Sequence, residues 1–318
     1  MLFSVIIPAF NVEKHIAATL DSLKAQTLKE AQFEIIIVND GSTDGTHAEI
    51  SRKISADMPN AKLLDQENSG VSHARNQGLR EAKGDYVYFL DGDDYIAPDF
   101  LQLMSDAIAS KSPQLLISSY GKVVDHKISR NFTNTDKYDS VERLKIAYLK
   151  GRLFVNMCTF VFKRECINEW QLSFDEKTKF GEDLEFYQNF LFLSSKVEIV
   201  EKACFYYVFR GDSAFNSKAG IRREDALLAL IRVQERLKRD CQNETIINAY
   251  RDYFFPQHIL KVVFRVTMEN DRPNAVKILK KYRPGLKAGR LSGKDFTKSK
   301  FAYFFPRAYV ATLFFRNN

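Results

Sequence analysis

Cysteine is scarce in this chain, and the few cysteines present exclude two common kinds of structural site. The sequence contains four, widely spaced and without a Cys-x-x-Cys pair: Cys158, Cys166, Cys204 and Cys241. This spacing argues against a zinc site or a disulfide framework and is typical of a protein in a reducing cytosol. Long apolar runs are also lacking, because no segment reaches the ~18 uninterrupted apolar residues that a membrane-spanning helix needs. The apolar start of the chain has no basic leader and is interrupted by Pro8 and Asn11, so we expect no signal peptide.

Acidic residues are nearly absent from the C-terminal end. Residues 271–318 contain twelve lysines and arginines but only two acids, Asp271 and Asp295, so this segment carries a formal charge of +10. The whole chain carries +7, which leaves −3 for residues 1–270. The basic character therefore belongs to the C-terminal segment alone. No RNA- or DNA-binding motif accompanies it, so we expect no nucleic-acid partner.

The first 120 residues alternate between strand-like and helix-like patterns. Apolar, β-branched runs predict strands at 3–8, 33–38, 61–64, 86–90 and 115–118. Helical spacing of apolar residues predicts helices at 13–26, 46–56, 69–82 and 98–110. Such an alternation indicates an α/β fold, with a mostly parallel sheet that is covered on both faces. In such sheets ligands bind at the carboxyl ends of the strands.

The rest of the chain divides into a mixed part and a helical part. Helices are predicted at 141–149 and 182–193, strands at 159–163 and 197–208, and further helices at 224–239, 245–267 and 273–281, with a break at Pro256. At 318 residues the chain has room for two domains. We place the α/β domain at 1–215 and a helical, basic C-terminal region at 216–318.

Three carboxylates follow the predicted strand at 86–90. Asp91, Asp93 and Asp94 fall within four residues, directly after an apolar run. Like charges this close repel each other, and burying them unpaired would cost roughly several kcal/mol. A hard divalent cation with oxygen ligands, Mg²⁺ or Mn²⁺, would relieve that repulsion. The alternative is a solvated acidic turn, because turns are rich in Asp and Gly.

A second polar turn follows the predicted strand at 33–38. Its acids, from Asp40 to Asp44, match several positions of an EF-hand calcium loop. The twelfth position is Ser51, however, where a bidentate Glu is needed, and the flanking elements are a strand and a helix. We interpret the turn as one that presents the Asp40 carboxylate to N–H or hydroxyl groups of a ligand. The alternative is an Asp-Gly turn whose carboxylate bonds its own backbone.

The predicted helix that begins at Asn68 or Ser69 carries Gly70 and Arg75 in its first turns. A helix start with a glycine can bring its backbone close to a phosphate, and an arginine can bind phosphate oxygens in a bidentate manner. Taken alone, Arg75 is better explained as a surface charge.

Two further charged pairs stand at element ends. Glu182 and Asp183 lie at a predicted helix start, where the helix dipole keeps a carboxylate ionised and suited to act as a general base. Arg210 and Ser213 flank a glycine turn and could clamp a phosphate. The alternatives are ordinary acidic enrichment of a helix start and a plain surface turn.

Together these residues resemble the motifs of the family 2 inverting glycosyltransferases of the GT-A fold. The matching segments are Ser4–Asn11, Val38–Asp44, Gly70–Gly78, Gly84–Asp94 and Gly181–Asp183, in the family's order. Each motif alone is weak, whereas five in order at suitable spacing are specific. The resemblance covers residues 3–213 and implies a GT-A nucleotide-diphospho-sugar transferase fold, Rossmann-like with a mostly parallel sheet, followed by a helical region.

The same resemblance implies a role for each candidate residue. Asp93 would ligate Mn²⁺ or Mg²⁺, Asp183 would be the catalytic base, and Glu182 would lie in the acceptor pocket. The uracil would lie beside Phe10 and bind Asp40. The implied nucleotide- and donor-binding residues are Pro8, Phe10, Asn11, Asp40, Asn68, Arg75, Asp91, Gly92, Asp94, Arg210 and Ser213.

The implied reaction moves a hexosyl or N-acetylhexosaminyl group from a UDP-sugar to a hydroxyl of a surface polysaccharide or lipid-linked oligosaccharide, with inversion. The chain lacks the Gln-x-x-Arg-Trp run of processive synthases, since its only tryptophan is Trp170. This absence, and that of membrane spans, favours the addition of one sugar per event. Two alternatives stay open: a catalytically inactive nucleotide-sugar-binding module and a nucleotidyltransferase. The second would want a glycine-rich phosphate loop, which residues 9–13 do not supply.

The C-terminal segment 298–315 is rich in aromatic residues, and basic residues precede and interrupt it. Basic amphipathic segments bind anionic membrane surfaces. One interpretation is therefore a cytoplasmic protein held peripherally on the inner face of the cytoplasmic membrane, where a lipid-linked acceptor would lie. The alternative is a C-terminal helix that packs its aromatic rings on the domain.

Overall fold

The computed structural model describes residues 1–210, 219–288 and 293–315, apart from the side chains of 288, 293–296, 314 and 315. The chain divides into two compact units, each assembled from separate segments. Unit 1 comprises Met1–Lys137, Leu153–Glu176 and Ser194–Gly211, and unit 2 comprises Tyr138–Arg152, Lys177–Leu193 and Asp212–Asn318. The predicted domains, by contrast, are continuous segments. The assignment of catalysis to residues 1–215 and of a helical, basic region to residues 216–318 stays a prediction.

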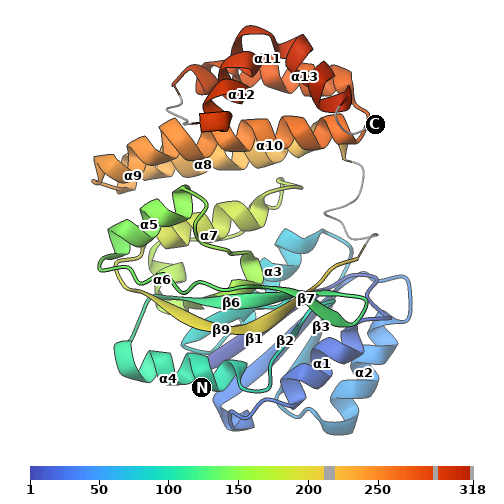
Figure 1. Ribbon diagram of the computed structural model, residues 1–318. Coiled ribbons are helices and arrows are strands. Elements are labelled where there is room, and N and C mark those ends of the chain that lie inside the picture. The colour runs from blue at the N-terminus through green and yellow to red at the C-terminus, as the bar shows by residue number, and fades with distance from the viewer. Residues whose placement is uncertain (211–218, 289–292, 316–318) are drawn as a thin grey trace. The chain divides into compact units, whose positions relative to one another are not determined.

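Unit 1 is built on a nine-stranded sheet (Figure 1). Its strands are β1 (Phe3–Ala9), β2 (Phe33–Asp40), β3 (Ala61–Gln66), β4 (Tyr86–Phe89), β5 (Tyr95–Ile96), β6 (Leu115–Val124), β7 (Lys127–Phe132), β8 (Phe160–Lys163) and β9 (Val197–Val208). Their order is β3-β2-β1-β4-β8-β6-β9-β5, and β7 pairs with β6. Strands β5, β7 and β8 run against the direction of the other six. The predicted mostly parallel sheet is therefore confirmed, with a mixed half beyond β4.

Helices cover both faces of this sheet (Figure 1). On one face lie α1 (Ile16–Lys24), α2 (Thr46–Asp57) and α4 (Phe100–Lys111), and on the other lie α3 (Val71–Glu81) and α6 (Arg164–Glu169). Short 3₁₀ turns at Glu30–Gln32 and Met157–Thr159 precede β2 and β8. The predicted helices in the first 120 residues are all present, with ends displaced by up to three residues.

The two faces of β1 explain how these layers are held together. Val5 and Ile7 are fully buried in the apolar cluster that also contains Phe100 of α4. On the opposite face, a Cβ atom added at Gly78 would lie 2.4 Å from a methyl carbon of Ile6. Only a glycine lets α3 approach the strand that closely. The continuous apolar run of β1 is thus a strand buried on both sides.

Two strands of unit 1 gave no signal in the sequence. β5 has only two residues, and β7 is exposed at five of its six positions, so neither shows an apolar pattern. The hairpin between β6 and β7 turns at Asp125 and His126, whose φ angles are +48° and +61°. Such turns usually carry Asn-Gly or Asp-Gly, and Asp-His lacks that signature.

The described part of unit 2 is helical (Figure 1). Its helices are α5 (Val141–Leu149), α7 (Glu182–Leu193), α8 (Asp225–Asp240), α9 (Glu244–Ala249), α10 (Phe255–Met268), α11 (Arg272–Ala288), α12 (Gly293–Phe304) and α13 (Pro306–Phe315), with a 3₁₀ turn at Gly220–Glu224. The predicted break at Pro256 takes the form of a π-helical turn, Tyr250–Phe254, that joins α9 to α10. Pro256 then lies in the first turn of α10. Among the described helices, none combines the length and apolar composition needed to cross a bilayer.

Candidate active site

A tight turn after β4 places the three predicted carboxylates. The Asp94 amide donates a hydrogen bond to the Asp91 carbonyl at 3.1 Å, which closes the turn. Gly92 is buried inside it, and its carbonyl accepts a hydrogen bond from the Thr19 hydroxyl at 3.0 Å. A Cβ atom on Gly92 would lie 3.2 Å from the Pro8 carbonyl oxygen. Gly92 therefore brings the acidic turn into close contact with the end of β1.

Arg75 of α3 pairs with the first of these carboxylates. Its Nη2 atom lies 2.9 Å from Asp91 Oδ1, and its side chain is 5% exposed while that of Asp91 is 39% exposed. The guanidinium carbon also lies 5.3 Å from the centre of the Phe174 ring. Phe174 is held by Asn76, whose side chain bonds both its carbonyl and its amide at 2.9 Å. Arg75 is thus a buried cation aimed at the acidic turn.

A second arginine reaches the same turn from the end of β9. Arg210 forms an ion pair with Asp93, and the Val208 amide donates a 2.7 Å hydrogen bond to Asp94 Oδ1. The predicted pairing partner of Arg210, Ser213, lies outside the described residues. The turn therefore gathers three carboxylates and two guanidinium groups.

Charge in this turn is only partly balanced. Burial, and after it the Asp91 carboxylate, raises the pKa of Asp93, while Arg210 opposes the shift. Burial, followed by the charges of Asp93 and Asp91, raises the pKa of Asp94 well above its usual range. Both shifts indicate that negative charge is held here at a cost. A divalent cation would remove that cost.

The donor atoms in the turn suit such a cation. Carboxylate oxygens of Asp91 and Asp94 and the Cys158 sulfur lie within 4.8 Å of one another. Hard ions such as Mg²⁺ and Mn²⁺ prefer oxygen to sulfur, so the two carboxylates, rather than the thiol, fit them. Asp93, the predicted metal ligand, lies in the same turn and contacts Arg210 in this structure. The residues present therefore fit a divalent cation.

Asp40, at the end of β2, fastens the start of α3. Its carboxylate accepts hydrogen bonds from the Ser69 amide at 2.8 Å and the Gly70 amide at 2.9 Å. The Asn68 side chain donates to the Asp40 carbonyl at 3.0 Å. The Gln66 side-chain amide donates to the same carboxylate at 2.6 Å, and its Oε1 atom lies 3.0 Å from His73 Nδ1. Asp40 therefore satisfies orphan N–H groups of the helix start.

The loop after β1 is tied to the turn after β2. The Asn11 amide donates to the Ser42 hydroxyl at 3.1 Å, and Asn11 Oδ1 accepts from the Thr43 amide at 2.9 Å. Asn11 has a φ of +51°, a conformation that asparagine tolerates better than most residues. Pro8 is half-buried in β1, and Phe10 exposes 47% of its surface. The exposed ring is thus held on a loop that hydrogen bonds fix in place.

Glu182 and Asp183 open α7, in unit 2. Gly181 precedes them with a φ of +89°, and a Cβ atom there would lie 2.9 Å from the backbone of Ala226. The Leu184 amide donates a 2.6 Å hydrogen bond to Asp183 Oδ1. Both acids are half-buried, at the end of the helix where the dipole favours negative charge.

Sequence reasoning missed several residues of this arrangement. Phe174, Gln66 and His73 support Arg75 and Asp40, but each belongs to a common residue type without a motif of its own. Cys158, whose sulfur lies beside Asp91 and Asp94, was judged only by its spacing from other cysteines. The contacts of Phe174 with Arg75 and of Cys158 with Asp91 span about 65–100 residues of chain, and the contact of Gln66 with Asp40 spans 26, so none of them leaves a local signal.

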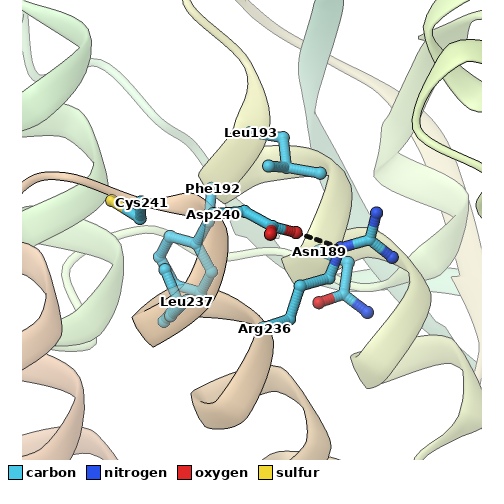
Figure 2. A pocket seen from close by; sticks show the side chains of 7 residues that line it. All are labelled: Asn189, Phe192, Leu193, Arg236, Leu237, Asp240 and Cys241. Atoms are coloured by element: carbon cyan, nitrogen blue, oxygen red, sulfur yellow. Dashed lines mark ion pairs between the residues drawn. The ribbon is translucent and has the colours of Figure 1, made fainter.

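One small pocket lies in unit 2, between α7 and α8 (Figure 2). It is lined by Asn189, Phe192, Leu193, Arg236, Leu237, Asp240 and Cys241. Arg236 and Asp240 form a 3.3 Å ion pair within it. Its volume of about 10 Å³ is at the lower limit for a single water molecule, so we assign it no ligand.

The sheet topology and the charged strand-end turn define an α/β protein of the GT-A type. The sequence profile of the family described as "Glycosyl transferase family 2" matches residues 4–169. This match covers more than half of the 318 residues, and the chain belongs to that family.

Relatives and solved structures extend this result. The chain is 30% identical over 213 residues to the uncharacterized glycosyltransferase EpsJ of Bacillus subtilis, a match that covers 65% of the chain and 60% of EpsJ. The structure of Staphylococcus aureus TarS residues 1–349 with UDP-GlcNAc superposes with a TM-score of 0.77 at 20% identity, covering 99% of this chain and 89% of that one. The mannosyltransferase PcManGT of Pyrobaculum calidifontis, solved with GDP-Man and Mn²⁺, gives 0.58 at 19% identity, with 99% and 86% coverage. The two structures support the fold alone.

Proposed function

We propose that this chain is a metal-dependent, inverting glycosyltransferase that moves a sugar from a UDP-sugar to an acceptor hydroxyl. One observation carries the proposal. In a family 2 chain, the turn after β4 brings three carboxylates and two arginines together at the carboxyl ends of strands. This is the edge at which α/β sheets bind their ligands. A cluster of both charge signs can hold a metal ion and a diphosphate at once.

The donor would bind in unit 1. Asp93 would ligate Mn²⁺ or Mg²⁺, with Asp91 and Asp94 beside it. A bound divalent ion supplies stabilisation of the negative charge that develops on a leaving diphosphate. Arg75 and Arg210 would turn part of their hydrogen-bonding capacity from carboxylates to phosphate oxygens, which they can bind in a bidentate manner. We assign Phe10, Pro8, Asn11, Asn68 and Asp40 to the nucleoside end of the donor, and Gly92 to the turn that holds it.

Asp183 would act as the general base. Its carboxylate would accept the proton of the acceptor hydroxyl as that oxygen attacks the anomeric carbon and the C–O bond to the diphosphate breaks. One displacement from the opposite face inverts the anomeric centre and needs no covalent intermediate. The helix dipole at the start of α7 favours a charged carboxylate at Asp183, and Glu182 beside it would line the acceptor pocket.

The choice of donor and acceptor is supported by relatives. TarS, solved with UDP-GlcNAc, is named a poly(ribitol-phosphate) β-N-acetylglucosaminyltransferase and is 25% identical over 227 residues, covering 71% of this chain and 38% of TarS. The chain spans only about 60% of the length of EpsJ. For this chain we propose a UDP-sugar donor and a surface polysaccharide or lipid-linked oligosaccharide acceptor, reached from the cytoplasmic side of the membrane.

A UDP-sugar panel tests the proposal. The purified chain is incubated with each UDP-sugar and Mn²⁺, with and without a chelator, and UDP release is measured. We expect release with one or few sugars, and its loss on chelation. Release of pyrophosphate instead would support a nucleotidyltransferase. Donor binding without any UDP release, with or without glycan acceptors, would support an inactive binding module. NMR of the product should show the anomeric configuration opposite to that of the donor.

A further inference from the structure

The turn between α12 and α13 carries exposed phenylalanines. Phe301, Phe304 and Phe305 expose 36%, 59% and 61% of their surface, and we call these three residues the aromatic corner. The ring centres of Phe301 and Phe305 are 6.0 Å apart, and those of Phe304 and Phe305 are 6.5 Å apart. Single exposed apolar residues are ordinary, but adjoining ones mark interaction surfaces.

The aromatic corner is a fixed part of unit 2. Ala302, Tyr309 and Val310, from the same two helices, are between 0% and 5% exposed. The Phe305 amide donates a 2.8 Å hydrogen bond to the Phe301 carbonyl, which carries the helical path into the turn. Of the two interpretations of this segment, packing of its aromatic rings on the domain therefore applies to the buried Tyr309. It leaves the aromatic corner facing solvent.

Cations surround the aromatic corner. Lys298 precedes Phe301 by three residues and Lys300 precedes Phe304 by four, so each lysine shares a helix face with a corner ring. Both lysines are exposed, as is Arg307 at the start of α13. The sequence from residue 296 to residue 318 contains no acid.

A further cation comes from α11. The Arg283 guanidinium carbon lies 4.5 Å from the centre of the Tyr303 ring. That ring in turn lies 4.9 Å from the ring of Phe304. Exposed aromatic rings and positive charge are thus combined on one side of unit 2.

We propose that the aromatic corner docks on an anionic lipid bilayer. Phenylalanine rings enter the boundary between headgroups and acyl chains, while lysine and arginine side chains reach the anionic headgroups. A second copy of this chain fits the same surface poorly, because docking would bring together two segments that each carry +10. The charge therefore selects the bilayer over self-association.

Vesicle sedimentation with the full chain tests this surface. The double variant Phe304→Ser/Phe305→Ser should lower the partition coefficient on phosphatidylglycerol-containing vesicles by about tenfold or more, because two large apolar side chains no longer enter the bilayer. The control Ile128→Ser removes a 52% exposed apolar side chain from β7 and should leave binding unchanged. Binding should weaken in high salt and on purely zwitterionic vesicles.

A charge variant separates the electrostatic contribution to vesicle binding from the apolar one. Arg283→Glu/Arg307→Glu should reduce binding to anionic vesicles by about fivefold or more per position. Thermal unfolding of each variant shows that the fold is retained. Unchanged vesicle binding by a folded double phenylalanine variant would overturn the proposal. So would a change in oligomeric state, seen by light scattering, without a change in vesicle binding. The assay needs no sugar transfer, so its outcome is independent of the proposed enzymatic function.

Discussion

The two regions to which we assign a function, the turn after β4 in unit 1 and the start of α7 in unit 2, hold charge in different ways. In the turn of unit 1, Arg75 forms an ion pair with Asp91, and Arg210 forms one with Asp93. The side chain of Arg75 is almost fully buried. At the start of α7, in unit 2, Glu182 and Asp183 are half-buried acids at the N-terminal end of a helix.

The difference matters because a buried charge needs a partner, whereas a half-exposed one is stabilised by water and a helix dipole. Changes at the turn of unit 1 should therefore disturb ligand binding together with stability. Changes to the Asp183 carboxylate should disturb chemistry more than donor binding.

Asp183→Asn should have the largest effect. Removing a general base typically lowers the turnover rate by about 10²–10⁴-fold, while the donor should bind as before because Asp183 lies outside unit 1. Steady-state transfer assays and calorimetric UDP-sugar binding measure the two quantities. Glu235→Gln, an exposed acid of α8 in the same unit, is the matched control. Full transfer activity in Asp183→Asn would remove this residue from the mechanism.

Asp93→Asn should weaken the Mn²⁺-dependent binding of the donor. It removes a carboxylate from the turn and from Arg210, and a charge-assisted contact contributes roughly 1.5–3 kcal/mol, so Mn²⁺-dependent donor binding should weaken by about tenfold to a hundredfold. Calorimetric titration of UDP with Mn²⁺ measures the change. Asp106→Asn, at an exposed position on α4, should bind as the unaltered chain does. If both variants bind equally well, Asp93 is not part of the donor site.

Gly181→Ala tests how α7 is positioned. The substitution combines a left-handed φ of +89° with a Cβ atom 2.9 Å from the Ala226 backbone, so we expect a loss of about 2–4 kcal/mol in the free energy of unfolding. Gly151 has a φ of +69° but nothing within 4 Å, so Gly151→Ala should cost only the backbone share, about 1–2 kcal/mol. Denaturant unfolding measures both variants. Equal losses would show that contact with Ala226 is unimportant.

His258 should give unit 2 a modest sensitivity to acid. Burial, and after it Lys261, lowers the pKa of His258 from 6.5 to about 3. Between these two values the unfolded chain binds the proton and the folded chain does not, so stability falls as the pH falls below about 6.5. The ring is only half-buried, which limits the loss to about 1 kcal/mol between pH 7 and pH 5.

The variant His258→Gln isolates this contribution. Its free energy of unfolding should fall less between pH 7 and pH 5 than that of the unaltered chain. Parallel pH profiles for the two proteins would show that His258 does not titrate as inferred.

Sequence reasoning predicted the parallel half of the sheet well. β1, β2 and β4 are short, continuous apolar runs, and such a run folds as a buried strand in most surroundings. The polar turns that follow them then meet at one edge of the sheet. For this reason the acidic turn could be placed correctly before any tertiary contact was known.

In the other half of the sheet, the sequence predicted the strands β6, β8 and β9 but not their order. β8 lies between β4 and β6 although about 35 residues separate it from β6, the nearer of them in the chain. β5 and β7 are defined by the strands they pair with, since neither has an apolar pattern. Long-range pairing decided these positions.

In the acidic turn, too, the sequence determines one part of the arrangement and the tertiary structure determines the other. The spacing of Asp91, Asp93 and Asp94 in the sequence determined that three carboxylates would crowd together after a buried strand, because neighbours in a turn cannot separate. Only the tertiary structure decided that Arg75 and Arg210, from α3 and from the end of β9, would be their partners. Pairing of that kind depends on which elements the folded sheet brings to one edge, and no local pattern records it.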